Sequence, residues 1–276
     1  MAVISRITTQ KKSKERYNIF LQDNHKEVFG FSVDESVLID YHLHKGKELD
    51  KTTIEDLMEK DTMQKAYNMV IHYLSYRMRT EKEIVDYLKK KEIPEIHIAS
   101  IMEKLIQNKL IDDHEFAESF VRTRMNTSEK GPVIIEKELL NKGVSKSIAD
   151  EAIQTYTYAE QRHNAEKLIA KKSNQRGTDS HRQKINRLQN HLLQKGFTQD
   201  VIQDIISSYV FEKDDEMEWQ ALVHHGKKQL RKLYRRYDGK QLENKMKESL
   251  YRKGFPFPLI QSFLDEYVSL EDDDLF

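Results

Sequence analysis

The chain contains no cysteine, which excludes disulfide bonds and metal sites built on thiolates. Proline and glycine are also scarce, with four and nine residues in a chain of 276, and this scarcity favours helices. No run of 18 apolar residues is present, and the first residues lack the pattern of a secretory signal peptide. We therefore expect a soluble cytoplasmic protein.

Neither sign of charge is in excess, because 46 Lys and Arg residues balance 46 Asp and Glu residues. A zero net charge argues against a protein that holds nucleic acid by bulk charge alone. The charges are unevenly placed, however. Basic residues crowd positions 6–16 and 227–236, whereas residues 212–218 and 271–274 are rich in acids. Such local patches suit a protein partner at least as well as a nucleic acid.

A short phrase, Leu-x-x-Lys-Gly followed by an apolar residue and then Pro, Ser or Thr, recurs along the chain. The four copies start at Leu88, Leu139, Leu192 and Leu250, at intervals of 51, 53 and 58 residues. Glycine after lysine predicts a helix that ends in left-handed backbone, and the Pro, Ser or Thr predicts the start of another helix. The first copy has Glu92 in the glycine position, which puts its left-handed turn in doubt.

Apolar pairs at helical spacing follow each copy, so each phrase precedes an amphipathic helix. A repeat of this period indicates stacked helical units. Residues 1–60 differ, because β-branched and aromatic residues at 4–9, 17–21 and 28–33 predict a small antiparallel sheet. Short helices are expected after Asp34 and at 53–60.

The predicted fold is therefore mainly α, with tandem three-helix repeats in an elongated, curved array and a small N-terminal antiparallel β module. The expected domains are a β-rich module at 1–60 and helical repeats at 61–110, 111–158, 159–211 and 212–276, the last with an acidic tail.

No constellation typical of catalysis or of a metal site is present. The tightest histidine pairs, at 42–44 and 224–225, lack a His-Glu-x-x-His motif, and solvated surface histidines explain them. Asp112 and Asp113 resemble a pair of catalytic carboxylates, yet a helix cap explains them more simply. We find no glycine-rich phosphate loop and no nucleophile–base pair. We expect no enzymatic activity, no cofactor and no metal.

Basic residues recur at the expected end of the first helix in three repeats, with Tyr76, Phe120 and Tyr234 nearby. The dipole at a helix C-terminus explains any one of them. Their recurrence favours a shared electropositive surface that binds a partner. The candidate residues are Arg77, Arg79, Arg122, Arg124, Lys227, Lys228, Arg231, Lys232, Arg235 and Arg236.

The helix-turn-helix spacing raises sequence-specific DNA binding as an alternative. The helices that follow the recurrent phrase begin with Pro94-Glu95 or Pro256-Phe257, however, rather than with the Arg, Asn or Gln residues that contact base edges. We therefore do not expect sequence-specific DNA binding.

Three stretches resemble the RecX family, the regulators of the RecA recombinase. They are residues 74–84 (Leu-Ser-Tyr-Arg-Met-Arg-Thr-Glu-Lys-Glu-Ile), 110–124 (which opens Leu-Ile-Asp-Asp-His-Glu-Phe) and 130–143 (which opens Lys-Gly-Pro). The likeness spans the whole chain and is closest to the longer form of Gram-positive bacteria. It implies roles for the first four candidate arginines and for four further residues, which we interpret as caps and turns. Those four are Asp112, Asp113, Gly131 and Gly143.

The resemblance implies a non-enzymatic regulator in DNA repair, recombination and the SOS response. Such a protein lies in the helical groove of the RecA–DNA filament and modulates its assembly, ATPase and recombinase activity, with inhibition expected and stimulation left open. The alternative is a protein that binds single- and double-stranded DNA directly, without sequence specificity, and affects RecA only secondarily. The expected partners are the RecA filament and DNA, with no membrane, and the expected state is a monomer.

Overall fold

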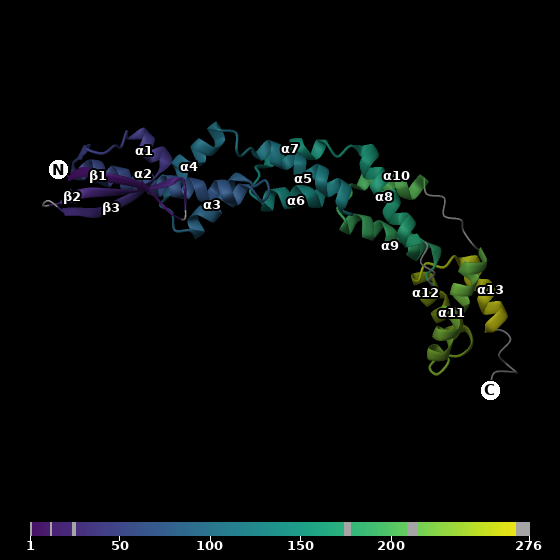
Figure 1. The fold of residues 1–276 in the computed structure, drawn as a ribbon. Helices are drawn as coiled ribbons and strands as arrows, with labels where there is room; N and C mark the ends of the chain where they lie inside the picture. Colours follow the sequence, from purple (N-terminus) through teal and green to yellow (C-terminus); the bar gives the residue numbers. More distant parts are fainter. Residues whose placement is uncertain (1, 12, 24–25, 174–177, 209–214, 269–276) are drawn as a thin grey trace. The chain divides into compact units, whose positions relative to one another are not determined.

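The computed structural model describes residues 2–11, 13–23, 26–173, 178–208 and 215–268. These residues form a four-stranded sheet and thirteen helices (Figure 1). They divide into two compact units, one of Met1–Ala117 with Asn141–Ile148 and one of Glu118–Leu140 with Ala149–Phe276. Lys12, residues 174–177, residues 212–214 and the acidic tail lie outside the described residues.

The N-terminal sheet is antiparallel, with strand order β3-β2-β1-β4. Its strands are β1 (Ala2–Thr9), β2 (Arg16–Asp23), β3 (Lys26–Asp34) and β4 (Glu48–Leu49). The first three occupy the predicted segments, whereas β4 is too short to show an alternating pattern. Ile4, Ile19 and Val33 are buried on the face that contacts the helices. Helix α1 (Glu35–Asp40) follows β3, and the Asp34 side chain caps it as predicted.

A single 24-residue helix, α2 (Lys51–Leu74), connects the sheet to the helical repeats. Leu57 near its start is buried in the core under the sheet, whereas Ala66 and Val70 are buried in the core of the first repeat. The prediction of a separate short helix at 53–60 was therefore wrong. The boundary expected between residues 60 and 61 falls inside a continuous helix.

Asp61 of α2 attaches the sheet to this helix. Its carboxylate is almost fully buried and contacts Arg16 at 2.9 Å and Lys65 at 2.8 Å. It also accepts the Asp34 backbone N–H at 2.8 Å. Burial acts to raise the pKa of Asp61, but the hydrogen bonds from Arg16, Lys65 and Asp34 outweigh it and hold the pKa below its usual value.

We expect Asp61→Asn to destabilise the first unit by roughly 3–5 kcal/mol near neutral pH, because it leaves Arg16 buried without its counter-ion. A carboxyl with a lowered folded-state pKa stabilises the fold above its unfolded pKa of about 3.9, and the gain is lost as the pH falls through the folded pKa. The stability gap between wild type and variant, measured by urea unfolding, should therefore shrink as the pH drops below about 4. Asp86→Asn, at an exposed site, is the control and should change little; an equal gap at all pH values would contradict the prediction.

Four sets of three helices follow the sheet, so the prediction of tandem three-helix repeats is confirmed. The first set is α2, α3 (Glu81–Lys90) and α4 (Glu95–Gln107), and the second is α5 (Asp113–Thr127), α6 (Pro132–Asn141) and α7 (Lys146–Gln154). The third is α8 (Tyr158–Ser173), α9 (His181–Gln194) and α10 (Gln199–Ser208), and the fourth is α11 (Asp215–Leu233), α12 (Gly239–Arg252) and α13 (Phe257–Tyr267). The apolar residue after each glycine is buried, as expected: Val144, Phe197 and Phe255.

Every copy of the recurrent phrase ends its helix in left-handed backbone. The φ angle is 92° at Gly143, 82° at Gly196 and 85° at Gly254. Glu92 adopts the same conformation, with φ 59°, although a side chain makes it unfavourable. The expected turn is therefore present in all four copies.

These turns also join consecutive helix sets. The Lys142 carbonyl accepts a hydrogen bond from the Thr80 hydroxyl at 2.7 Å, and the Lys253 carbonyl accepts one from the Ser180 hydroxyl at 2.5 Å. The Lys195 carbonyl accepts the Gly131 N–H at 2.7 Å. Each donor begins or precedes the second helix of the preceding set. The same type of joint between consecutive helix sets is thus present three times.

Close approach at these joints explains why three copies have glycine and the first does not. A Cβ on Gly143 would lie 2.4 Å from the Lys82 side chain, and one on Gly196 would lie 2.8 Å from the Ile134 backbone nitrogen. Glu92 belongs to the first helix set, which no other set precedes, and it is exposed. Its side chain therefore has room that the other turns lack.

We expect Glu92→Gly to stabilise the first unit by about 0.5–1 kcal/mol, because glycine relieves the left-handed strain but loses more chain entropy on folding. Thermal unfolding measures the change. The neighbouring Lys91→Gly, at φ −88°, is the matched control and should destabilise by about 0.5–1 kcal/mol. A lowered melting temperature for Glu92→Gly would show that the Glu92 side chain stabilises the turn.

Candidate functional site

The ten candidate basic residues fall into three groups on different elements. Arg77 and Arg79 lie in the loop between α2 and α3, in the first unit, and not at a helix end as the sequence predicted, because α2 already ends at Leu74. Arg122 and Arg124 lie inside α5 near its end, in the second unit. The third group covers the end of α11 and the turn after it.

Arg77 is held by a carboxylate of its own repeat. Its guanidinium contacts both oxygens of Glu83, at 3.0 and 3.1 Å, and Lys142 Nζ lies 2.9 Å from the same carboxylate. Partial burial acts to raise the pKa of Glu83, but Arg77 and Lys142 outweigh it and lower that pKa. The Thr80 hydroxyl accepts the Glu83 N–H at 3.2 Å and so caps the start of α3, which is one half of a capping box.

Arg79 is the first member of a stack of side chains. Its guanidinium lies 3.7 Å from the centre of the Tyr73 ring and donates to the Tyr73 hydroxyl at 2.9 Å. The Tyr73 ring stacks on Tyr87, with centres 4.1 Å apart and an interplanar angle of 8°. Lys91 lies over Tyr87 at 5.7 Å. This packing indicates that Arg79 stabilises the loop as well as exposing charge.

Arg124 is also paired, whereas Arg122 is not. Arg124 Nε lies 2.9 Å from the Glu138 carboxylate and forms an ion pair with it, without the geometry of a hydrogen bond. The Arg124 guanidinium also lies 4.8 Å from the centre of the Phe120 ring. Burial acts to raise the pKa of Glu138, but Lys130 and Arg124 outweigh it and lower that pKa. Arg122 is exposed and forms no ion pair with another described residue.

The third group differs from the others because its charges have no counter-ion among the described residues. We name it the α11 basic face; it consists of Lys227, Lys228, Arg231, Lys232, Arg235 and Arg236. All six residues are exposed, and none forms an ion pair with another residue of the described ranges. Lys227 lies over the Tyr267 ring at 4.5 Å, and Tyr234 beside them is 48% exposed.

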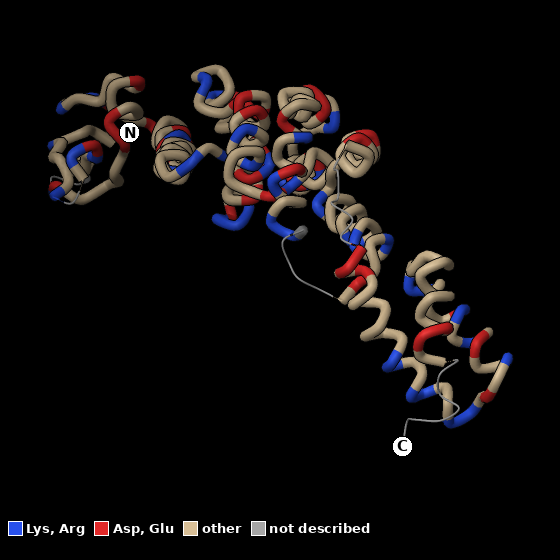
Figure 2. The backbone as a smooth tube through the Cα atoms, turned by 90° about the vertical axis from the view of Figure 1, so that its right-hand side faces the viewer, with Lys and Arg blue, Asp and Glu red and all other residues tan. Residues whose placement is uncertain are grey.

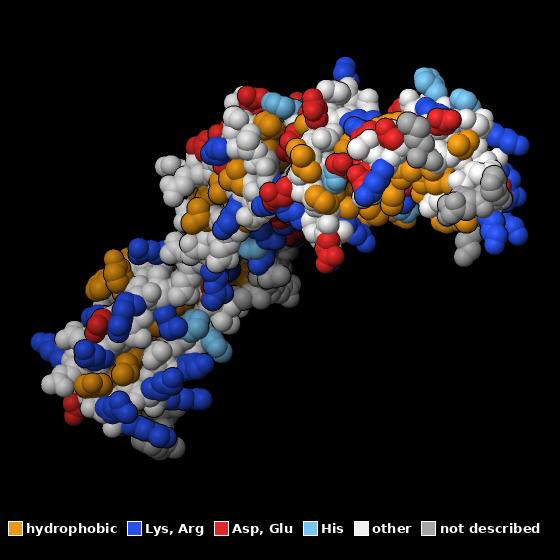
Figure 3. All heavy atoms as spheres, turned by 90° about the vertical axis from the view of Figure 1, so that its left-hand side faces the viewer, with side chains coloured by type: hydrophobic (Ala, Val, Ile, Leu, Met, Phe, Trp, Pro, Cys, Tyr) orange, Lys and Arg blue, Asp and Glu red, His pale blue; other side chains and the backbone are white. Residues whose placement is uncertain are grey.

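Helical geometry explains why these side chains share one side. At 100° per residue, the four that lie within α11 span an arc of about 140°, and the buried Gly226 and Leu230 lie outside it. Lys and Arg side chains cover much of the lowest lobe in Figure 3, which is α11–α13. Residues 227–253 hold eleven Lys and Arg residues but three Asp and Glu residues. Of these cations, Lys245, Lys247 and Arg252 of α12 pair with Glu243 or Glu248.

The acids that precede this face in the sequence, at 212–218, are distant from it where the structure describes them. Asp215, Glu216 and Glu218 begin α11. Glu218 precedes Lys227 by nine residues, which is about 14 Å along a helix. Figure 2 shows that the acidic start of α11 and its basic end lie apart. The described part of 212–218 therefore does not pair with the α11 basic face.

The sequence missed the carboxylates that hold the arginines. Neither Glu83 nor Glu138 was among the candidate site residues, although both face Arg and Lys residues. The aspartates and glycines interpreted as structural are confirmed in that role. Asp112 caps α5, Asp113 accepts the Glu81 N–H at 2.9 Å, and Gly131 and Gly143 lie at joints.

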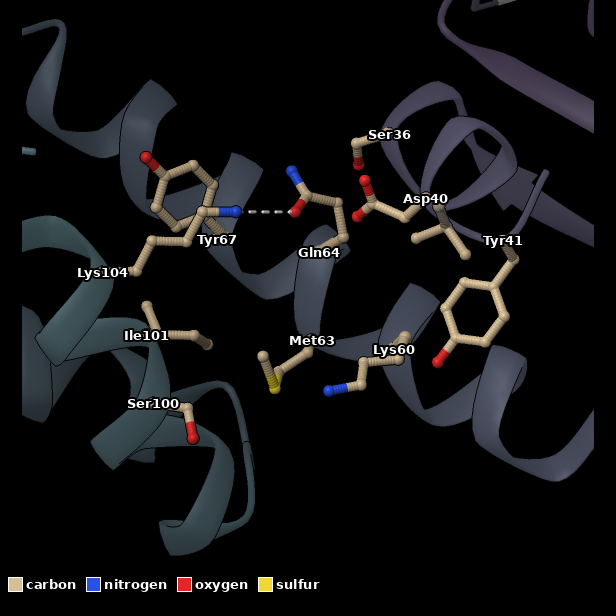
Figure 4. A pocket seen from close by; sticks show the side chains of 11 residues that line it. Ser36, Asp40, Tyr41, Lys60, Met63, Gln64, Tyr67, Ser100, Ile101 and Lys104 are labelled. Carbon is tan, nitrogen blue, oxygen red and sulfur yellow. Dashed lines mark hydrogen bonds between the residues drawn. The ribbon is translucent and has the colours of Figure 1, made fainter. Parts of the chain in front are cut away.

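A recess of about 230 Å³ lies in the first unit between α1, α2 and α4 (Figure 4). Lys104 reaches over Tyr67 and donates to Gln64 at 3.3 Å. Tyr41 donates to Asp56, which raises the pKa of Tyr41 to about 12 and keeps the phenol protonated at neutral pH. The Tyr41 phenol is thus not an activated nucleophile. No group of three potential metal ligands occurs among the described residues, and His224 and His225 pack edge to face at 5.5 Å.

Within the described ranges, no helix has the length and apolar character needed to cross a membrane. Four family models match the chain. They are the Regulatory protein RecX N-terminal domain at residues 2–50 and the first and second three-helix domains of RecX at 66–105 and 112–153. The third three-helix domain of RecX matches twice, at 160–206 and 215–264.

Curated relatives are similar over almost the whole chain. Regulatory protein RecX of Oceanobacillus iheyensis is 48% identical over 274 residues, which cover 99% of this chain and 100% of that protein. Regulatory protein RecX of Bacillus cytotoxicus is 44% identical, with 96% and 97% covered.

Two crystal structures are also similar. A regulatory protein RecX has a TM-score of 0.65 and 41% identity, and the match covers 75% of this chain and all of that one. RecX from Lactobacillus salivarius has a TM-score of 0.52 and 43% identity, with 54% and 96% covered.

Proposed function

The chain belongs to the RecX family, and we propose that it regulates the RecA recombinase by binding the RecA–DNA filament through the α11 basic face. The observation that carries this proposal is a set of six exposed cations at the end of α11 and in the turn after it, without a described counter-ion. Phosphates and acidic side chains on a filament are ligands that such a surface attracts. All matched family models are RecX domains, and we propose that the protein acts as a monomer, without catalysing a reaction.

Binding along a filament would inhibit it by competing for the surface that incoming RecA subunits, or the second DNA, must contact. The paired arginines Arg77 and Arg124 have a smaller part in this proposal, because each already has a carboxylate partner. Arg122 remains a candidate contact, since it is exposed and has no ion pair with another described residue.

Direct, non-specific DNA binding is the second candidate function. The exposed Tyr234 favours it, because an aromatic ring among cations is a platform on which bases of single-stranded DNA stack. The zero net charge of the whole chain favours the filament, since it limits binding to bare DNA near physiological salt.

Co-sedimentation with RecA filaments and binding to bare single-stranded DNA distinguish the two functions. We expect filament binding to persist from about 50 to 200 mM salt, whereas binding to bare DNA falls steeply over that range. The ATPase of RecA on single-stranded DNA should decrease as the protein is added. Unchanged ATPase together with strong, salt-resistant binding to bare DNA would favour the second function.

A further inference from the structure

The α11 basic face lies beside the point where the described chain ends. In the fourth repeat, α13 packs on α11 so closely that a Cβ on Gly226 would lie 2.3 Å from the Phe263 ring. One turn later, Tyr267 lies under Lys227 at 4.5 Å. Val268 packs on the same core and is the last described residue. The chain therefore leaves α13 next to the first cation of the face.

The eight residues that follow have the opposite charge. Residues 269–276 read Ser-Leu-Glu-Asp-Asp-Asp-Leu-Phe, with four consecutive acids and no Lys or Arg. An extended chain of this length reaches about 26 Å. The α11 basic face from Lys227 to Arg236 is only about 14 Å long. All of its cations are thus within reach of the acids from residue 268.

We propose that residues 269–276, the acidic segment, bind the α11 basic face in the free protein and compete there with anionic partners. The occupant follows from charge complementarity and from the place where the segment starts. Its attachment at residue 268 gives it an effective concentration of the order of millimolar, so individually weak ion pairs suffice for binding. Leu270, Leu275 and Phe276 flank the acids and supply apolar contacts for exposed rings such as Tyr234.

Competition of this kind would set a minimum number of negative charges that a partner needs in order to bind the α11 basic face. A partner with few charges cannot displace the acidic segment, whereas a polyanion such as a RecA–DNA filament offers many phosphates at once. The competition rests on the function proposed above, but docking of the acidic segment does not, so the two are tested separately.

Docking is tested on the free, full-length protein by carbodiimide crosslinking, which joins a carboxylate directly to a lysine amine. In the monomer fraction at low salt, we expect links from Asp272, Asp273 or Asp274 to Lys227, Lys228 or Lys232, and their loss at high salt. The quadruple variant E271Q/D272N/D273N/D274N should lack them. If these links are absent at low salt, the inference is overturned.

Competition is tested with the same quadruple variant, which should bind single-stranded DNA and RecA filaments at least fivefold more tightly at about 50 mM salt. The control D86N/E92Q/E95Q/E103Q removes the same number of charges from exposed sites in the first unit and should gain much less. An equal gain in both variants would overturn the competition. If the crosslinks form but the quadruple variant gains no affinity for DNA or filaments, docking is supported and the binding role of the α11 basic face is not.

Discussion

Reversal of four charges on the α11 basic face, in R231E/K232E/R235E/R236E, is expected to weaken binding to the RecA–DNA filament at least tenfold. A tenfold loss corresponds to about 1.4 kcal/mol, which is modest for four cations replaced by anions. These side chains are exposed and have no described counter-ion, so their reversal breaks no described ion pair and costs the fold only the small interaction with the helix dipole. We expect the melting temperature to be retained while inhibition of the RecA ATPase is lost.

The salt dependence gives a second measurement on the same variant. If the four residues contact phosphates, the slope of log affinity against log salt should become shallower by roughly 3–4, since each contact releases a counter-ion. The defect should also shrink as salt rises, because exposed charges are screened beyond about 8–10 Å. An unchanged slope with weaker binding would indicate contact with RecA side chains rather than with DNA.

A matched control separates this surface from net charge. The variant K45E/K51E/K89E/K90E changes the charge of the chain by the same amount, at exposed sites of the first unit. It should retain most of its inhibition of the RecA ATPase. If both variants lose inhibition equally, or if the first is folded and still inhibits fully at low salt, the α11 basic face is only a solvated helix surface.

Local signals in the sequence predicted the secondary structure of the repeats well. The Lys-Gly turn needs only a few neighbouring residues to form, and the caps by Asp34 and Asp112 act within one helical turn. The helix predicted to end at residue 60 instead continues to Leu74 as α2, because polar residues alone do not end a helix. No glycine or proline interrupts residues 51–74, and that absence was the stronger signal.

Contacts between distant residues could not be predicted from the same patterns. Glu81 receives its cap from Asp113, and Arg77 shares Glu83 with Lys142. The sequence shows that these residues can form such bonds, but not which partner lies nearby. From the sequence, all the candidate arginines therefore looked equally able to bind a partner. The structure separates Arg77 and Arg124, which have carboxylate partners, from Arg122 and the α11 basic face, which form no ion pair with another described residue. The sequence could not make this division.

The joints between helix sets carry the second large prediction, for Gly196→Ala. An alanine at φ 82° strains the backbone by about 1–2 kcal/mol. Its Cβ would also lie 2.8 Å from the Ile134 nitrogen, so the turn must move away from α6. That movement weakens two hydrogen bonds, Gly131 N–H to Lys195 at 2.7 Å and Val133 N–H to Gly196 at 3.1 Å. We expect the second unit to lose about 3–5 kcal/mol in total.

Two companion variants separate strain from close approach. Gly46 has φ 88° and nothing within 4 Å of an added Cβ, so Gly46→Ala should cost only the about 1–2 kcal/mol of strain. Gly131 is not among the residues with positive φ, yet its Cβ would lie 2.4 Å from Gly196, so Gly131→Ala tests the joint alone. Urea unfolding followed by circular dichroism measures all three, and Trp219 fluorescence reports on the second unit. If Gly196→Ala costs no more than Gly46→Ala, the joint adds nothing to stability, and glycine recurs in the phrase only for its backbone conformation.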